Sequence, residues 1–509
     1  MNLLRSRCLL VLAMAAAPGA GRAADAAAPI RIRVYHTNDI HGWIMSRPDR
    51  LQPDRLVGGA AALASFIGRE TGPKLVLDAG DWWQGTPEGS LTKGESVAEV
   101  FNAIGYDALV VRNHEYDSGA EDLKALIGKI KAPVLSANTY TKDGKRASWV
   151  KSWIVKEVAG VKIGIFGLTT SNMPRLAFSK NIAGLKFRRE VDEGRDAVKE
   201  LKEAGAEVII AVTHIGLEEE GKGRFEGDQT LAREIGGIDL VVGGHSHTTL
   251  LRPLRDAEHG TLIVQAGCYL VRAGRATLTI DPATHRVLSS EDELVELRPE
   301  RVGEDAPVKA IVAKHAAAVG SVFETVVATV TVAMNRESEK ESGIGSWMAD
   351  CYKDWAGADA AFQNGGGIRA DIPAGPLTLR AIYGVMPFDN EIVKLKMTGA
   401  VLREVLEHGV GMARLMQVGG TSVVYRRGKP MGERVVSAAV GGAPLDDAKT
   451  YAVAALDFIV VGGDGFNAFA KADVNEPTGV LARDVLRRCA EKQKTVAPPE
   501  SGRLRVQED

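Results

Sequence analysis

The chain has 509 residues, a formal net charge of −2 and an isoelectric point near 6.6. This length favours two domains over one, and the hydrophobic content of 45% with a charged content of 25% is typical of globular proteins. The nearly balanced charge argues against a polymeric nucleic acid as partner, because such binders carry a clear excess of Lys and Arg. A mononucleotide is compatible with this composition.

The N-terminus has the composition of a secretory signal peptide. Arg5 and Arg7 precede the apolar run CLLVLAMAAA, and small residues follow it. This order is typical of a cleavable export signal, and the apolar run is too short for a spanning helix. We predict a signal peptide over residues 1–24, with cleavage between about Ala23 and Ala28. No other uninterrupted apolar run reaches the length of a membrane span. The mature protein is therefore expected to be periplasmic or secreted.

Cysteine usage is sparse. Cys8 belongs to the signal peptide, which leaves Cys268, Cys351 and Cys489 at wide spacing and without a CxxC motif. Neither a zinc ribbon nor a dithiol redox site is indicated. We expect buried free thiols in preference to a disulfide, although the compartment would permit one disulfide whose pairing the sequence does not specify.

Short β-rich runs alternate with helical patterns from about residue 30 to residue 290, which predicts a layered α/β domain. The predicted strands cover residues 30–36, 74–81, 108–113, 162–170, 207–216, 238–247 and 261–267, and clear helical patterns cover 58–70 and 194–205. Polar residues capable of chemistry follow several of these strands. In open α/β sheets, functional sites are built at this carboxyl-terminal edge.

The remaining chain predicts a second α/β domain. Residues 301–335 are rich in alanine, periodic and without site-like residues, so we predict a linker helix there. A helix is then expected over 342–357 and a strand over 449–460. The predicted organisation is a first domain over 29–300, the linker over 301–335 and a second domain over 336–509.

The strand ends carry an unusual set of metal-binding side chains. Asp39 and His41 in the stretch HTNDIHG are two residues apart, so both can face the same point. Later strand ends add further donors, namely Asp81, Asn113, His114, His214, His245 and His247. Five of the 10 histidines belong to this set, which favours a metal centre over isolated structural histidines. Imidazole, carboxylate and amide donors suit Zn, Mn, Co or Fe, and there are enough donors for two ions bridged by one carboxylate.

Taken in order, the motifs DIHG, GD, NHEYD, TH and GHSH resemble the calcineurin-like metallophosphoesterases. The later motifs NGGGIRADIPAG, MPFDN and GGDGF resemble the C-terminal nucleotide-binding domain of the secreted 5'-nucleotidase family. The resemblance covers essentially the whole mature chain. It implies an N-terminal four-layer α/β/β/α metallophosphoesterase sandwich, a linker helix and a smaller C-terminal α/β domain that rotates about the linker.

The resemblance also implies roles for individual residues. One divalent ion would be held by Asp39, His41 and His247, the other by Asn113, His214 and His245, with Asp81 bridging the two. His114, oriented by Asp117, is implied as the catalytic histidine that stabilises charge on the phosphoryl oxygens, while the metals activate the attacking water. The implied substrate-binding residues are Asn364, Arg369, Phe388, Asn390 and Phe466, with the two phenylalanines enclosing the nucleobase.

Two positions depart from the family pattern. Arg112 stands where the motif GNHE has its glycine, and we expect it either to help hold phosphate or to narrow access for bulky substrates. Lys340 begins the triplet KES where many relatives carry Arg-Glu-Ser/Cys. Because lysine is a point charge and not a planar fork, a bidentate phosphate contact there is in doubt. His247 replaces a glutamine of some relatives, and either residue can bind a metal.

The implied function is metal-dependent hydrolysis of nucleoside 5'-monophosphates to nucleoside and phosphate, a step of nucleotide catabolism. Alternatives with the same motifs are a UDP-sugar diphosphatase, a 2',3'-cyclic-nucleotide phosphodiesterase and a relative that hydrolyses a thiosulfate ester. A non-enzymatic solute-binding or adhesion protein is disfavoured, because every ligand position carries a competent donor and both His114 and Asp117 are present. The sequence specifies neither the metal, the preferred nucleotide nor the oligomeric state.

Overall fold

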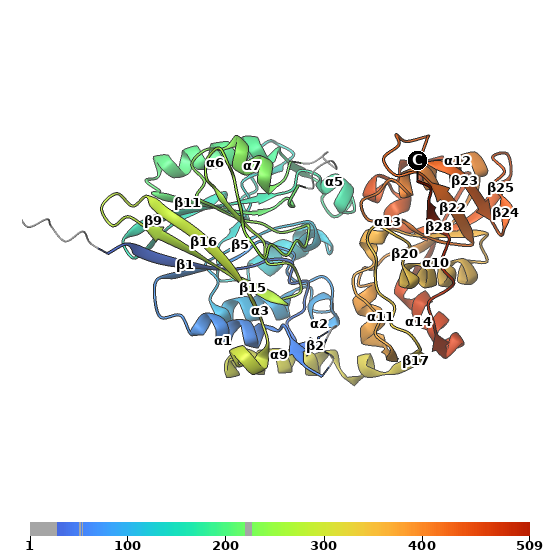
Figure 1. Cartoon of the computed structure of the whole chain (residues 1–509), viewed down its shortest axis with the longest axis horizontal. Coiled ribbons are helices and arrows are strands. Elements are labelled where there is room, and N and C mark those ends of the chain that lie inside the picture. Colours follow the sequence, from blue (N-terminus) through green and yellow to red (C-terminus); the bar gives the residue numbers. More distant parts are fainter. Residues whose placement is uncertain (1–27, 50–51, 53, 219–225, 509) are drawn as a thin grey trace, which may run out of the picture.

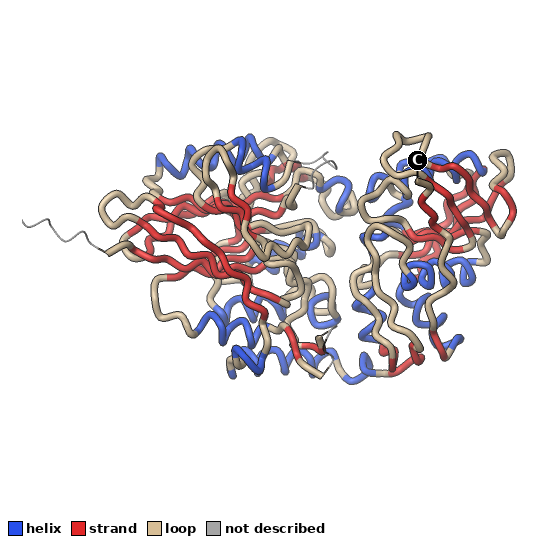
Figure 2. The backbone as a smooth tube through the Cα atoms, in the orientation of Figure 1, coloured by secondary structure: helices blue, strands red, loops and turns tan. Residues whose placement is uncertain are grey.

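The computed structural model describes residues 28–49, 52, 54–218 and 226–508. The predicted signal peptide lies outside these residues. Two α/β lobes lie side by side, the first coloured from blue to yellow-green and the second from orange to red (Figure 1). In each lobe, helices flank the strands (Figure 2).

The first domain is built on two six-stranded sheets. The strands of the first sheet lie in the order β16 (Val287–Glu296), β15 (Arg272–Ile280), β1 (Ile30–Thr37), β4 (Lys74–Asp78), β5 (Ala108–Val110) and β6 (Val134–Leu135). Those of the second lie in the order β13 (Leu254–Arg255), β14 (Leu262–Val264), β12 (Leu240–Val242), β11 (Val208–His214), β9 (Val161–Thr169) and β8 (Trp153–Val158). The central strands of each sheet are parallel, so their carboxyl ends lie at one edge.

The two sheets pack face to face, with helices on both outer faces. Between the sheets lies an apolar core that includes Ile32, Leu75, Ile163 and Ile210, each completely buried. The outer face of the first sheet packs against α1 (Ala60–Gly68), α3 (Glu95–Ile104) and α9 (Ala306–Val319). The outer face of the second sheet packs against α6 (Glu190–Glu203) and α7 (Asp228–Glu234). The predicted α/β/β/α sandwich is confirmed.

The strands and helices follow from the sequence pattern. The central strand β11, VIIAVTH, is buried on both faces, which explains why its sequence is continuously apolar. Helix α6 begins with Glu190, Asp192 and Glu193, whose negative charges suit a helix N-terminus. The other elements of this domain are β2 (Arg47–Pro48), β3 (Leu56–Val57), α2 (Pro87–Ser90), η1 (His114–Tyr116), α4 (Ala120–Ile127), β7 (Thr139–Thr141), α5 (Met173–Leu176), β10 (Leu185–Phe187) and α8 (Pro299–Val302).

The connection between the domains differs from the single helix predicted over 301–335. Helix α9 covers only Ala306–Val319, because Gly320 adopts a positive φ of 82° and ends it. The chain continues through η2 (Ser321–Glu324) into β17 (Val326–Val330), which pairs with strands of the second domain. The β-branched sequence VVATV favours this strand over a longer helix.

The second domain contains three sheets. Its central sheet has the order β21 (Gln417–Gly419), β18 (Ala360–Gln363), β25 (Thr450–Leu456), β20 (Glu391–Thr398) and β26 (Val474–Leu481). A second sheet contains β24 (Ala443–Pro444), β23 (Val435–Val440), β22 (Thr421–Tyr425) and β28 (Leu504–Val506), and a third joins β17 to β19 (Gly375–Thr378) and β27 (Thr495–Val496). The helical elements are α10 (Gly343–Ala356), η3 (Gly365–Gly367), α11 (Leu379–Val385), α12 (Gly399–Gly409), α13 (Asp457–Val460), η4 (Gly463–Gly465), η5 (Asn467–Lys471) and α14 (Ala482–Gln493). The helix predicted over 342–357 and the strand over 449–460 correspond to α10 and β25.

The expectation of free thiols is wrong for two of the three cysteines. Cys351 on α10 and Cys489 on α14 form a disulfide, and Cys268 is free. The two helices pack against each other on one side of the central sheet, which brings together residues separated by 138 positions. Spacing in the sequence carried no information about this contact.

Candidate active site

Backbone geometry at the strand ends is unusual. The φ angles are 53° at Asp39, 52° at His41, 60° at Asp81, 81° at His245 and 57° at His247. Residues other than glycine seldom adopt this left-handed conformation, and such positions gather at functional sites where the surrounding structure imposes them. The sharp turns after β1, β4 and β12 therefore direct these side chains to a common point.

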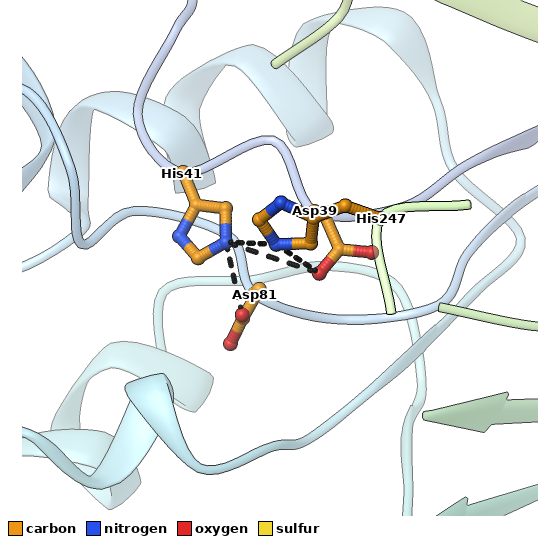
Figure 3. A group of neighbouring side chains, drawn as sticks. All are labelled: Asp39, His41, Asp81 and His247. Atoms are coloured by element: carbon orange, nitrogen blue, oxygen red, sulfur yellow. Dashed lines mark hydrogen bonds and ion pairs between the residues drawn. The ribbon is translucent and has the colours of Figure 1, made fainter. Parts of the chain in front are cut away.

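Four of the predicted ligands form a compact group that could hold a metal ion, here named the metal-binding group (Figure 3): Asp39, His41, Asp81 and His247. Their donor atoms all lie within 4.8 Å of one another. Nε2 of His41 is 3.0 Å from Oδ2 of Asp81, and Nε2 of His247 is 3.2 Å from Oδ1 of Asp39. Nδ1 of His41 donates to the carbonyl of Gln84 at 2.8 Å, which leaves the Nε2 lone pair directed into the group.

The protonation states suit a cation. Burial lowers the pKa of His41 and brings that of His247 to about 3, so both rings are neutral and offer lone pairs. Burial would raise the pKa of Asp81, but the adjacent Arg112 guanidinium and the nearby histidines bring it well below its usual value. Neutral imidazoles beside ionised carboxylates form a donor set that fits a borderline divalent ion.

Other predicted ligands lie beside this group. Nδ1 of His214 donates to the carbonyl of Ala79, and Nε2 of His214 is 3.4 Å from Oδ1 of Asp39. Within the described part of the chain, four buried atoms of the predicted ligands have no hydrogen-bond partner: Asp39 Oδ1, Asp81 Oδ1, Asn113 Oδ1 and His214 Nε2. Buried polar atoms are almost always hydrogen-bonded, so this cluster of unpaired acceptors also fits a bound cation.

Arg112 matches neither role expected from the sequence. Its side chain is completely buried and does not line the cavity between the two domains, so it neither contacts a ligand there nor narrows the entrance. Nη1 lies 2.7 Å from Oδ2 of Asp81, and Nη2 donates to Nδ1 of His245 at 2.5 Å. Burial and the Arg112 charge hold the pKa of His245 well below its usual value, so this ring accepts the hydrogen bond in its neutral form.

His114 occupies the position expected of a catalytic histidine. It begins η1, where its Nδ1 is 2.8 Å from Oδ2 of Asp117. Its Nε2 points the other way and lies 3.9 Å from Oδ2 of Asp81. The ring stacks on Phe388 of the second domain, with centroids 5.4 Å apart. Asp117 thus fixes the orientation of His114 toward the metal-binding group.

Two further buried carboxyl groups, those of Asp78 and Glu115, hold the loop that carries Asp81. Asp78 accepts hydrogen bonds from Thr37 Oγ1 at 2.6 Å and from the backbone N–H of Gly80 at 2.8 Å. Glu115 accepts from the backbone N–H groups of Asp81 and Trp82. Burial raises the pKa of Asp78 to about 8, so its carboxyl group is largely protonated at neutral pH.

A cavity of about 1010 Å³ lies between the two domains. The first domain contributes Asp81, Asn113, His114, Asp117, His245 and His247 to its lining, and the second contributes Asn364, Arg369, Phe388 and Asn390. Asp39, His41 and His214 are completely or almost completely buried. His41 contacts Asp81 and Asp39 contacts His247, both of which line the cavity, and His214 contacts Asp39. The structure therefore brings almost all predicted site residues to one cavity.

The residues of the second domain reach directly to the metal-binding group. Nη2 of Arg369 donates to Nε2 of His41 at 2.9 Å, and the guanidinium carbon lies 5.8 Å from the centre of the Phe388 ring. The amides of Asn364 and Asn390 donate to Asp464 and Asp457, so in the structure they shape the loops beside the cavity.

Phe466 is not placed beside Phe388. It is completely buried, packs against His408 and Phe469 and does not line the cavity. Phe458 lines the cavity instead and makes an edge-to-face contact with Phe178 of the first domain, with centroids 5.9 Å apart. The predicted pair of enclosing phenylalanines is therefore not assembled in this arrangement.

Lys340 also lies away from the cavity. Its side chain is 71% exposed and lies 3.7 Å from Glu337. Arg414 lines the cavity, and Arg336 donates to the carbonyl of Arg369 and to the hydroxyl of Tyr269. Neither arginine was predicted from the sequence. Arg336 begins an Arg-Glu-Ser triplet just before KES, so a sequence motif could have identified it. No such motif contains Arg414.

Comparison with known proteins identifies the family of both domains. Residues 32–249 match the family model for calcineurin-like phosphoesterases, and residues 325–471 match the model for the 5'-nucleotidase C-terminal domain. The snake venom 5'-nucleotidase of Gloydius brevicauda is 31% identical over 94% of this chain and 89% of its own length. The chain belongs to the 5'-nucleotidase family.

Two further comparisons support the same family. The 5'-nucleotidase of Bos taurus is 29% identical over 94% of this chain and 91% of its own. The crystal structure of a 5'-nucleotidase precursor from Thermus thermophilus has a TM-score of 0.87 and 29% identity, covering 94% of this chain and all of that one. The predicted family and enzyme class, a metal-dependent phosphoesterase, are confirmed. Within the described ranges no helix has the length and apolar character needed to cross a bilayer.

Proposed function

We propose that this protein hydrolyses nucleoside 5'-monophosphates to nucleoside and phosphate. The observation that carries the proposal is the shared cavity, where the metal-binding group of one domain faces Arg369 and Phe388 of the other. A phosphate ester needs a cationic site for its charge and a nucleoside needs an aromatic surface. Both are present within one enclosed space.

The metal-binding group is the proposed site of phosphate chemistry. Asp39, His41, Asp81 and His247 would hold a divalent ion, with Zn, Mn, Co or Fe best suited to their donors. Such an ion, when bound, polarises a phosphoryl oxygen and lowers the pKa of water. The family resemblance implies two such ions, bridged by Asp81.

His114 is the proposed source of additional charge stabilisation. Its Nδ1–H can donate to Asp117, which keeps Nε2 directed toward the cavity. An Nε2–H at this position can donate to a phosphoryl oxygen as charge develops there, and a donor of this kind is typically worth a factor of about 10²–10³ in turnover.

Arg369 and Phe388 are the proposed recognition residues. The planar guanidinium of Arg369 can bind two phosphate oxygens at once, and the partly exposed ring of Phe388, which lines the cavity, can pack against a nucleobase. Phe458, which also lines the cavity, is the better placed second aromatic residue in this arrangement, whereas Phe466 would need to leave the core. Asn364 and Asn390 would position the surrounding loops.

A nucleotide sugar is the second candidate substrate. The cavity volume of about 1010 Å³ is at the upper end of ordinary ligand pockets, which leaves room beyond a mononucleotide. UDP-sugars, 2',3'-cyclic nucleotides and thiosulfate esters are therefore included in the test below.

Export is part of the proposal. The composition of residues 1–24 supports a signal peptide, and the disulfide between Cys351 and Cys489 supports an oxidising compartment such as the periplasm or the extracellular space. N-terminal sequencing of the protein from host-cell fractions would test this. A full-length chain retained in the cytoplasm would contradict it.

The deciding experiment measures phosphate release from AMP by the purified protein, before and after EDTA treatment, and then with Mn, Co or Zn added back. We expect EDTA to abolish the activity and a divalent ion to restore it. UDP-glucose, 2',3'-cyclic AMP and a thiosulfate ester are assayed in parallel. Preference for one of these substrates over AMP would replace the proposed substrate, and metal-independent hydrolysis would refute the proposed site.

A further inference from the structure

Arg112 lies where the resemblance places a second metal ion. The implied ligands of that ion are Asn113, His214 and His245, with Asp81 as the bridge. The guanidinium of Arg112 already contacts Asp81 at 2.7 Å and His245 at 2.5 Å, and its Nη1 lies 3.5 Å from Oδ1 of Asp39. We infer that the protein binds one divalent ion per chain, and that the Arg112 side chain takes the place of the second. This inference rests on the proposed function.

The two halves of the metal centre differ in how complete they are. In the first, the donor atoms of Asp39, His41, Asp81 and His247 are within 4.8 Å of one another. In the second, Oδ2 of Asp81 is paired with Arg112, and Nδ1 of His245 accepts from it. The only expected donors left unpaired among the described residues are Asn113 Oδ1 and His214 Nε2, apart from the free Oδ1 of Asp81. A second ion would therefore have to bind beside a guanidinium that already contacts one oxygen of Asp81 and Nδ1 of His245.

The Arg112 side chain is built into this position. It is completely buried, and its aliphatic part packs over Gly80, where an added Cβ would lie 2.6 Å from Cγ of Arg112. Gly80 has a φ of 94° and supplies the space that the side chain needs. If the guanidinium left this position, it would lose its contacts with the carboxylates of Asp39 and Asp81.

A guanidinium in this place has defined chemical consequences. It is permanently charged and carries only donors, so it cannot bind a metal and it repels a second cation beside it. It neutralises part of the charge of Asp39 and Asp81 without depending on metal supply. The remaining charge is left for a single ion at the first group, which contacts the cavity through Asp81 and His247.

Metal content tests the inference directly. The purified full chain is saturated with Mn²⁺, passed through a desalting column and analysed by mass spectrometry for metal per chain, and its electron paramagnetic resonance spectrum is recorded. We expect one Mn²⁺ per chain and the six-line signal of an isolated ion. Two ions per chain with a spin-coupled signal would overturn the inference while leaving the proposed nucleotidase function intact, and no bound metal would refute both.

Variants identify the residue responsible. Arg112→Gly is expected to raise the content to two ions per chain and to produce the spin-coupled signal, whereas a folded variant that still binds one ion would overturn the inference. Arg298→Gly is the matched control, because Arg298 is also a buried, ion-paired arginine of the first domain, with partners Asp49 and Glu296 away from the metal centre. It should leave the content at one.

A second pair of variants keeps the test decisive should Arg112→Gly fail to fold. His247→Ala, which removes a ligand of the first group, should reduce bound Mn²⁺ well below one per chain. Asn113→Ala, which removes a ligand of the implied second site, should leave it at one. Equal loss of metal in both variants would overturn the inference.

Discussion

In the first domain, backbone turns fix the positions of the candidate site residues, whereas the second domain reaches the same cavity with side chains that extend across the domain boundary. Asp39, His41 and Asp81 have positive φ angles and are almost completely buried, so their positions are fixed by the turns that carry them. Arg369 and Phe388 follow η3 and α11 with ordinary backbone conformations and extend across the domain boundary to His41 and His114. This difference indicates that bond-breaking requires fixed geometry, while recognition tolerates adjustable contacts. The predictions below test this division of roles.

The largest effect is expected at Asp81. Asp81→Asn removes the carboxylate shared by His41, Arg112 and the proposed ion, and several kcal/mol of transition-state stabilisation go with it. Since about 1.4 kcal/mol corresponds to a tenfold change in rate, kcat for AMP should fall at least about 10³-fold. Asp78→Asn is the matched control. Asp78 is a buried carboxyl group at the end of β4, just before the same loop, and the side-chain oxygen of Asn can still accept a hydrogen bond there, so the activity of this variant should stay close to wild type.

The second largest effect is expected at His114, and it should appear in kcat. His114→Asn removes the donor aimed at the phosphoryl group, so kcat should fall about 10²–10³-fold with little change in KM. Asp117→Asn, which only loosens the orientation of His114, should cost about 10–100-fold. Steady-state kinetics with AMP would measure both. A rise in KM without a loss of kcat would contradict the role given to His114.

Arg369 provides the first test of the second domain. Arg369→Lys keeps the charge but loses the planar fork, and one charge-assisted hydrogen bond is worth about 1.5–3 kcal/mol. We expect kcat/KM for AMP to fall roughly 10–100-fold, which follows from about 1.4 kcal/mol per tenfold change. Unchanged kinetics would show that the phosphate is held by other residues, of which Arg414 in the cavity lining is one candidate.

Phe458 and Phe466 should behave differently. Phe458→Leu removes a ring that lines the cavity and should raise KM for AMP severalfold, since stacking on one base is worth about 1–3 kcal/mol. Phe466→Leu alters the core and should lower the melting temperature without a comparable change in KM. Parallel kinetics and thermal melting would decide. The reverse outcome would mean that Phe466 leaves the core when the substrate binds.

The smallest effect on turnover is expected from the disulfide. Cys351→Ser combined with Cys489→Ser should destabilise the second domain by about 2–4 kcal/mol, because the cross-link restricts the unfolded chain. The metal-binding group lies in the other domain, so kcat should not change. Thermal melting together with activity at low temperature would test this. A large loss of kcat would show that catalysis depends on the stability of the second domain.

The part of the site that could be predicted is the part built by strand ends. Asp39, His41, Asp81 and His247 converge because the carboxyl ends of parallel strands share one edge, a property that follows from the order of strands in the sequence. The family resemblance added the second domain and the roles of its motifs. Both inferences depend on regular backbone and on short motifs.

The rest depends on packing that a sequence does not express. The direction of the Arg112 side chain is set by the space over Gly80, and the burial of Phe466 is set by its contacts with His408 and Phe469. The pairing of Cys351 with Cys489 depends on how α10 and α14 meet. The linker helix was predicted too long because the prediction followed the alanine-rich helical pattern and did not take Gly320 as the residue that ends the helix.

The central claim is that one domain performs the chemistry while the other selects the nucleotide. The most direct test compares kcat/KM for AMP with that for p-nitrophenyl phosphate, which has no nucleoside, in the wild type, Phe388→Leu and His114→Asn. We predict that Phe388→Leu lowers the value for AMP alone, and that His114→Asn lowers both by a similar factor. Equal losses for both substrates in Phe388→Leu, or no loss for either, would contradict the claim.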